Sequence, residues 1–207
     1  MLDYQLLLQN QYKSMPWKNG LGKTLEIQRC DDQHGLRFRI SQASVVEDGL
    51  FSDFSGLHRT LVILSGNAIA LKHTSDCHSN THVLDNLLDI ARFSGGDKTY
   101  ASLQGGKIED LNIMVRERDT HAMVSALVSG QSLNLSNPES PLLTAFYAND
   151  FCSINLDINV VASGNISLPA NSLLLFKAPK ALMNKQLLMM DGSGVLIKIS
   201  GKVAVPS

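Results

Sequence analysis

The sequence lacks the charge excess and the long apolar runs that mark several classes of protein. Its 207 residues carry 18 basic and 19 acidic side chains, a formal net charge of -1, and no run of like charge that could follow a nucleic-acid backbone. No stretch approaches the roughly 18 consecutive apolar residues of a membrane span. The first residues, MLDYQLLLQNQYKS, carry an acid where a signal peptide has basic residues. We therefore expect a cytoplasmic protein whose partners include neither nucleic acid nor a membrane.

Cysteine is scarce, and histidine lacks the spacing of a metal site. Cys30, Cys77 and Cys152 are an odd number at wide intervals, which is typical of reduced thiols rather than of a disulfide framework. None of the six histidines forms an H-x-H pair. The one candidate group for a metal ion has the spacing of a solvated hairpin: His73, Cys77, His78 and His82. We expect no bound metal and no cofactor.

Alternation of polar and apolar residues with a period of two recurs along the chain and predicts β-strands. The clearest examples are residues 23–28, 36–45, 107–116 and 151–156. Turn signals rich in glycine, asparagine and proline separate these segments at short intervals. Many short strands with regular turns are typical of a β-sandwich or a β-barrel. Since hydrophobic residues form 44% of the chain, a sizeable core is expected.

The chain divides into two halves that share this rhythm of strands. Residues 130–141, rich in serine, asparagine and proline, predict the connection, so we expect an N-terminal barrel over residues 1–130 and a C-terminal half over residues 131–207, joined in one compact unit. Strands are predicted in the second half at residues 142–148, 151–157, 160–168, 172–177, 185–190 and 194–200. Helical periodicity is confined to residues 83–91 and 178–188, where we expect at most one or two turns.

Three blocks of sequence resemble the HutD/Ves family in their order and spacing. They read MPWKNGLGKTLEI from Met15, RISQASVVEDGLFSDFSGLHRTL from Arg39, and FSGGDKTYASLQGGKIEDLNIMVR from Phe93. The resemblance covers residues 10 to 118. It implies an all-β, double-stranded β-helix fold of two cupin-like barrels, called a bicupin. It also implies a link to histidine utilisation or a stress response, through control that responds to a metabolite.

Alternate residues at the end of the third block share one face of a strand, since successive side chains point to opposite faces. These residues are Asp110, Asn112, Met114 and Arg116. On periodicity alone this face is either a solvent-exposed edge or the lumen of a barrel, and the family resemblance favours the lumen. We predict that Glu26, Arg39, Asn112 and Met114 face a common cavity, with Ile27, Ile40, Leu111 and Ile113 on the opposite side.

Further polar and aromatic residues complete the candidate ligand site. Ser41 shares a strand face with Arg39, and Arg59 opens an apolar strand, where a buried guanidinium needs a partner. The alternative for Arg59 is a rim position with an ion pair to Asp48 or Asp53. Trp17 and Asn19 lie in a loop that either covers a pocket or plugs one end of the barrel.

These residues support two functions of different classes. The first is the binding of a small anionic metabolite, which we predict to be a carboxylate held mainly by Arg59. The second is a metal-independent enzyme, an isomerase, lyase or hydrolase that uses Glu26, His58 or Asp110 as acid and base. The sequence offers many donors but no recognisable nucleophile and no metal triad, so binding is favoured over catalysis. A homodimer remains open.

Overall fold

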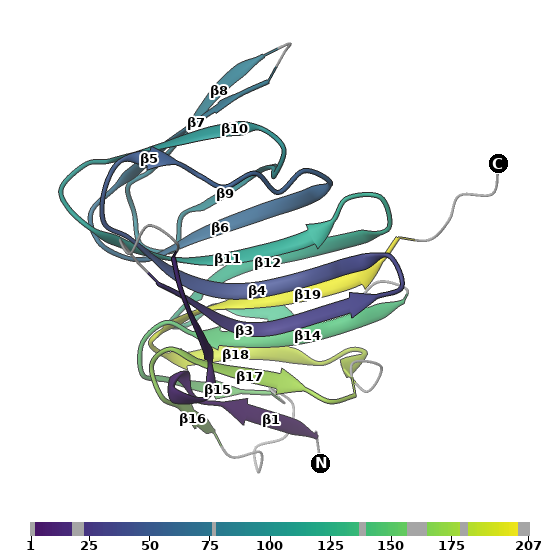
Figure 1. Ribbon diagram of the computed structural model, residues 1–207. Helices are drawn as coiled ribbons and strands as arrows, with labels where there is room; N and C mark the ends of the chain where they lie inside the picture. Colours follow the sequence, from purple (N-terminus) through teal and green to yellow (C-terminus); the bar gives the residue numbers. More distant parts are fainter. Residues whose placement is uncertain are drawn as a thin grey trace. The chain divides into compact units, whose positions relative to one another are not determined.

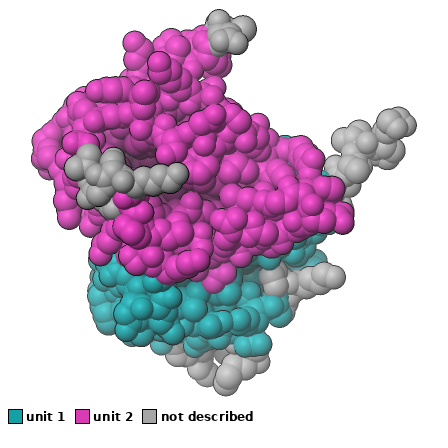
Figure 2. Space-filling view, viewed as in Figure 1, with its two compact units in different colours: residues 1–12, 119–207 teal, residues 13–118 magenta. Residues whose placement is uncertain are grey.

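The fold is almost entirely β-strand, as the alternation predicted (Figure 1). The computed structural model describes residues 3–17, 23–75, 78–136, 140–156, 165–178 and 182–202. Within these ranges no helix has the length and apolar character needed to cross a membrane. The chain forms two compact units, coloured separately in Figure 2: unit 1 comprises residues 1–12 and 119–207, and unit 2 comprises residues 13–118.

Unit 2 is built from two antiparallel sheets. The larger sheet has six strands in the order β2-β3-β4-β11-β6-β9. Their bounds are Lys13–Pro16 for β2, Lys23–Asp32 for β3, Gly35–Val45 for β4, Ile108–Arg116 for β11, Leu57–Ser65 for β6 and Ile90–Ser94 for β9. The smaller sheet has the order β5-β10-β7-β8. Its bounds are Gly49–Leu50 for β5, Lys98–Leu103 for β10, Ile69–Thr74 for β7 and Ser79–Leu84 for β8.

The core of unit 2 draws apolar side chains from both of its sheets. Leu61 and Ile63 come from β6, while Ile69, Leu71 and Ala101 come from β7 and β10, and all five are buried. Alternation along each strand places these side chains on the inward face. Three partly buried side chains, Trp17, Phe51 and Leu103, pack against this cluster.

Unit 1 is also built from two antiparallel sheets. Its larger sheet has the order β1-β17-β14-β19-β12 and its smaller sheet the order β13-β18-β15-β16. The bounds are Tyr4–Leu7 for β1, Ser172–Phe176 for β17, Pro141–Ala148 for β14, Ser193–Gly201 for β19 and Thr120–Val128 for β12. In the smaller sheet they are Ser132–Asn134 for β13, Gln186–Asp191 for β18, Cys152–Asn155 for β15 and Ile166–Leu168 for β16. A 3-10 turn, η1 (Gln9–Gln11), follows β1.

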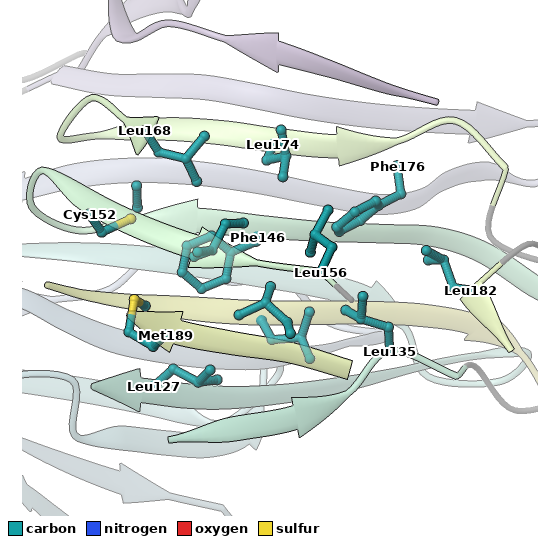
Figure 3. Close-up of a cluster of buried hydrophobic side chains, with 14 residues drawn as sticks. Leu127, Leu135, Phe146, Cys152, Leu156, Leu168, Leu174, Phe176, Leu182 and Met189 are labelled. Atoms are coloured by element: carbon teal, nitrogen blue, oxygen red, sulfur yellow. The ribbon is translucent and has the colours of Figure 1, made fainter. Parts of the chain in front are cut away.

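Apolar side chains fill the interior of unit 1. Phe146, Leu174 and Leu196 from the larger sheet meet Ile154 and Met189 from the smaller one. Figure 3 shows this cluster, with Phe146 among side chains that come from several strands. Cys152 belongs to the same cluster, and burial raises the pKa of its thiol to about 12, so it behaves as a buried apolar side chain.

The bounds of the two units differ from the division expected at residue 130. β12 pairs along its whole length with β19, and β1 pairs with β17, so residues 119–128 and the first residues of the chain lie in unit 1. The segment expected to be only a connection contains β13, which pairs with β18. These pairings join residues distant in the sequence, and local composition carries no signal for them.

Candidate functional site

Unit 2 has an open cavity of about 590 Å³, lined by residues of both its sheets. The surface of unit 2 is hollowed on the face seen in Figure 2. β4 contributes Arg39, Ser41, Ala43 and Val45, and β11 contributes Asp110, Asn112 and Met114. These residues alternate along their strands, as the sequence predicted for Arg39, Asn112 and Met114. Leu111 and Ile113 lie between them on β11, are fully buried and do not line the cavity.

The cavity floor consists of rows of side chains that run across three strands. Met114 is paired with Arg39 of β4 on one side and with Arg59 of β6 on the other. Neighbouring strands lie about 4.8 Å apart, so the backbones of the two arginines are about 10 Å apart across this row. In the next row, Asn112 is paired with Ser41. Two guanidinium groups and an amide therefore approach the same cavity from one face of the sheet.

Arg59 is 5% exposed and held by aromatic rings rather than by a carboxylate. Its Cζ atom lies 4.9 Å from the ring centre of Phe51, 5.4 Å from Phe54 and 5.1 Å from Phe93. Its Nη2 donates a 2.7 Å hydrogen bond to Oδ1 of Asn112. Burial lowers the pKa of Arg59 to about 10, so the group stays charged at neutral pH. Aromatic faces attract a cation, which offsets part of the cost of burying it.

The ion pairs expected as the alternative for Arg59 do not occur among the described residues. Asp53 instead accepts hydrogen bonds from the backbone and hydroxyl of Ser55, at 2.8 and 2.7 Å. Asp48 accepts a 2.8 Å hydrogen bond from the backbone N–H of Leu103. Asp53 therefore fixes a local turn, and Asp48 holds its segment to the end of β10.

Arg39 is the second guanidinium at the cavity and has a carboxylate partner. Its Nε lies 2.9 Å from Oε2 of Glu26 on β3, and both side chains are 11% exposed. Glu26 is not among the lining residues, so it supports Arg39 from the neighbouring strand. Glu26 is paired in register with Ser41, so it lies on the face that alternation predicted, with its carboxylate directed at Arg39.

Asp110 is the buried acid of the cavity. Its side chain is 1% exposed and accepts a hydrogen bond from Nδ2 of Asn112. Burial, the largest influence, raises the pKa of Asp110 to about 7, against the opposing effects of Arg59 and Asn112. Asn112 thus links the guanidinium of Arg59 to this carboxyl group, with its carbonyl toward Arg59 and its amino group toward Asp110.

Aromatic residues supply the apolar part of the lining. Trp17, Phe51 and Phe54 all line the cavity, and the indole N–H of Trp17 donates a 2.9 Å hydrogen bond to Oγ1 of Thr24. Phe51 and Phe54 were not singled out from the sequence. Their spacing before Arg59 within the second family block is the signal that could have identified them.

Three of the residues singled out lie elsewhere, and one lies outside the described residues. Arg116 forms a two-pronged ion pair with Asp32, at 2.8 and 2.6 Å, and does not line the cavity. It shares a strand face with Asn112 but lies four residues on, about 13 Å along the strand. Glu26 forms an ion pair with Arg39 and does not line the cavity, and neither does His58 on β6. Asn19 falls outside the described residues.

The histidines of β7 and β8 form a hydrogen-bonded pair. Nδ1 of His82 lies 3.0 Å from Nε2 of His73, whose Nδ1 lies 2.9 Å from the hydroxyl oxygen of Thr99. Burial, with a smaller effect of His82, lowers the pKa of His73 to about 4. His78 instead contacts the hydroxyl of Ser75. No group of three or more metal-binding side chains occurs among the described residues; Cys77 lies outside them.

Known proteins resemble this chain in sequence over about half of its length and in fold over nearly its whole length. An uncharacterised 21.2 kDa protein of Pseudomonas putida, named for its position in the hutC 3' region, is 36% identical over 116 residues, which span 55% of this chain and 59% of that protein. Protein Ves of Escherichia fergusonii is 37% identical over 112 residues, which span 52% of this chain and 56% of that protein.

Among solved structures, HutD of Pseudomonas fluorescens SBW25 matches with a TM-score of 0.77 and 21% identity, covering 97% of this chain and 100% of that one. A bacterial pirin of Escherichia coli, solved with nickel(II), has a TM-score of 0.61 at 9% identity and covers 97% of this chain and 100% of that one. At these identities the structures show the fold alone. The two-barrel, all-β architecture with a polar cavity in one barrel is that of a cupin-like protein of the bicupin kind. The chain belongs to the HutD family, whose model matches residues 9–198.

Proposed function

We propose that this protein binds a small carboxylate in the cavity of unit 2. The observation that carries the proposal is a set of buried N–H donors on the two arginines of the cavity that make no hydrogen bond within the described part of the chain. They are Nε of Arg59 and both Nε and Nη2 of Arg39, although Nε of Arg39 lies 2.9 Å from Glu26 in their ion pair. Burying a donor without a partner costs about 1–3 kcal/mol, and more for a charged group. A bound carboxylate would provide the missing acceptors.

The electrostatics of the two arginines favour an anion over a neutral ligand. Arg39 lowers the pKa of Arg59, which means that the two guanidinium groups repel each other across the row of Met114. An anion held near both groups relieves this repulsion. A guanidinium also presents a planar fork of donors that matches the two oxygens of a carboxylate.

The other lining residues indicate a ligand with an apolar body. Trp17, Phe51, Phe54 and Met114 offer apolar surface beside the polar floor. A volume of about 590 Å³ is within the usual range of about 300–1,000 Å³ for small-molecule sites. The rings around Arg59 also hold its side chain in place before binding, which reduces the ordering cost of complex formation.

Asp110 supports a second candidate, a metal-independent enzyme. A carboxyl group in a cavity with a pKa of about 7 is poised to give and take a proton near neutral pH. Glu26 and His58, the other candidate acids and bases, do not line the cavity. Enzyme activity would therefore rest on Asp110 alone. Exchange of ligand C–H protons with heavy water, followed by NMR, would separate this function from simple binding.

The biological role that fits a carboxylate-binding member of this family is control that responds to a metabolite. The HutD family, and the position of the Pseudomonas putida relative beside hutC, connect the proposal to histidine utilisation. We accordingly propose a cytoplasmic regulator of histidine utilisation or of a stress response, with a small anionic metabolite as its partner. A homodimer is compatible with this role.

The test is a comparison of carboxylates with their matched amides, using Trp17 as the reporter. Trp17 is the only tryptophan in the chain and lines the cavity, so its fluorescence reports on ligands bound there. Acetate, propionate, butyrate and acids of the histidine pathway should change the fluorescence in a saturable way. A ligand at a hundredfold its Kd should also add about 2.7 kcal/mol to the free energy of unfolding. If no acid binds, or the amides bind equally well, the proposal fails.

A further inference from the structure

The charges at the base of the cavity cancel before any ligand arrives. Arg39 and Arg59 supply two positive charges, and Glu26 and ionised Asp110 supply two negative ones. Glu26 is committed to Arg39, at 2.9 Å. A carboxylate that enters beside Arg59 would add a third negative charge to this group. Because Arg59 and Asp110 are buried, an uncompensated charge beside them is costly.

Asp110 is the acid that can become neutral by taking up a proton, because its hydrogen-bond partner is a neutral amide rather than a guanidinium. Arg59 and Asp110 are not in direct contact: the amide of Asn112 lies between them, accepting from Arg59 at 2.7 Å and donating to Oδ1 of Asp110. A neutral amide compensates a buried carboxylate less than a guanidinium does. The amide leaves Oδ2 of Asp110 as the oxygen that can carry a proton.

The other charged groups near Asp110 are a hydrogen-bonded glutamate on its own strand, two exposed carboxylates at the cavity wall and two arginines. On its own strand, Glu109 accepts hydrogen bonds from Gln42 and Ser44 and raises the pKa of Asp110 slightly. At the cavity wall, Glu47 and Asp48 are exposed, so water screens them. On β4 and β6, the facing charges are Arg39 and Arg59. Asp110 is thus the only carboxyl group in the described lining that is both buried and free of an ion pair.

We propose that the cavity binds a carboxylate together with one proton, which is taken from solvent and held on Oδ2 of Asp110. This inference rests on the proposed function and specifies its chemistry: the site accepts an acid as anion plus proton. Protonation changes Asp110 from an acceptor into a donor, so its O–H can donate to the bound carboxylate. The total charge at the base of the cavity then stays the same before and after binding.

The pKa of Asp110, which burial raises to about 7, sets the pH range in which this linkage is visible. Below this pH the proton is already present, and above it each pH unit makes the proton harder to acquire. For one linked proton, the apparent Kd should rise about tenfold between about pH 6 and pH 8. Alkyl carboxylates are ionised across this range, so the slope originates in the protein.

The experiment is a titration of Trp17 fluorescence with acetate, propionate and butyrate at three pH values from about 6 to 8. The wild-type Kd should rise about tenfold for every acid that binds. Asp110→Asn cannot titrate and keeps the shape and the acceptor for Asn112, so its Kd should not change with pH. Glu109→Gln is the matched control on the same strand and should keep the slope, because its side chain does not line the cavity.

The outcomes separate this inference from the proposed function. If carboxylates bind wild-type protein with a Kd that is constant over this range, proton-linked binding is refuted while carboxylate binding stands. An unchanged slope in Asp110→Asn would also refute it, since another group would be the source. If none of the carboxylates binds at any pH, both the proposed function and this inference fall.

Discussion

Arg39 and Arg59 show how one residue type takes two roles within a single row of side chains. Arg39 is neutralised by Glu26 at 2.9 Å, whereas Arg59 is surrounded by three phenylalanine rings and bonded to an amide. A ring face attracts a cation but accepts no strong N–H hydrogen bond. Arg59 consequently keeps more of its capacity to bind an anion, which is the reason we assign it the main contact with the ligand.

Asp110 should make stability depend on pH in a way that can be isolated. Its pKa is about 7 in the folded protein, against 3.8 for a free aspartate side chain. A raised pKa means that Asp110 favours folding below about pH 4, and that this contribution is lost as the pH rises through 7. One pKa unit corresponds to about 1.4 kcal/mol, so the loss is on the order of a few kcal/mol.

Asp110→Asn removes the loss of stability that comes with ionisation of Asp110, because the amide has no charge to bury. Relative to wild type, the variant should be more stable at pH 8, while the difference should shrink toward pH 5. Urea unfolding at both pH values measures this. Equal pH dependence in the two proteins would show that Asp110 is ionised at no cost, and would remove the main reason for treating it as the proton carrier.

At the level of single residues, the sequence predicted which strand faces line the cavity but not which residues on those faces reach it. Alternation correctly placed Arg39, Asn112 and Met114 on a common cavity, with Leu111 and Ile113 off it. Alternation sets the face, whereas position along the strand and across the sheet decides which residues reach the cavity. For this reason Arg116 pairs with Asp32 instead, and Glu26, on the predicted face, pairs with Arg39.

The segment between β5 and β6 is the element that brings aromatic rings to Arg59. Backbone hydrogen bonds fix it to other strands: Phe51 donates to Thr99 at 2.9 Å, and Phe54 donates to Gly95 at 2.9 Å. Gly95 in turn donates to Leu57 at 2.7 Å. The segment lies so close to Gly95 that a Cβ atom there would come within 2.5 Å of the carbonyl oxygen of Phe54. Only glycine permits this contact.

Gly95→Ala should therefore displace the segment that carries Phe54 and weaken ligand binding. A Cβ at 2.5 Å from a backbone oxygen forces a shift, and overpacking of this kind costs about 1–3 kcal/mol of stability. Thermal unfolding and a fluorescence titration with the best-binding acid measure the two effects. Gly96→Ala is the matched control, since its nearest contact is the hydroxyl of Ser55 at 3.1 Å. A Gly95→Ala protein with wild-type Kd would show that the segment does not position the site.

At the scale of the whole chain, the two units use similar pairs of sheets for different purposes. Unit 1 fills its interior with apolar side chains such as Phe146 and Leu174, both fully buried. Unit 2 has an apolar cluster too, but part of its interior is the cavity with Arg39, Arg59 and Asp110. We therefore expect the filled interior to contribute to stability alone, and the proposed ligand site to lie in the hollow one.

This division predicts that a core mutation in unit 1 lowers stability without changing the binding constant. Leu174→Ala removes a fully buried side chain and should lower the free energy of unfolding by about 2–5 kcal/mol. At a temperature where the variant is folded, its Kd for a carboxylate should match wild type. Leu87→Ala, the same change at a residue that is 55% exposed, should cost about 0.5 kcal/mol or less. A raised Kd in folded Leu174→Ala would contradict the assignment.

The sequence predicted the all-β class, most strands and the family, but not the bounds of the two units. The strand patterns and the three blocks that resemble the family are local features of the sequence, and local features suffice for these conclusions. The pairing of β1 with β17 joins residues about 170 positions apart, and nothing near Tyr4 indicates its partner Phe176. The aromatic surroundings of Arg59 depend on similar long-range contacts with Phe93.

The central claim, that Arg59 binds the carboxylate, is tested most directly by the Kd of Arg59→Lys. Lysine keeps the charge but loses the planar fork, so affinity should fall by about 1.5–3 kcal/mol, roughly ten- to a hundredfold. Arg116→Lys is the control, because Arg116 is equally buried but pairs with Asp32 and does not line the cavity. Fluorescence titration with the best-binding acid should show a weakened Arg59→Lys and a wild-type Kd for Arg116→Lys. An unchanged Kd in folded Arg59→Lys would make Arg59 a structural residue and contradict this account.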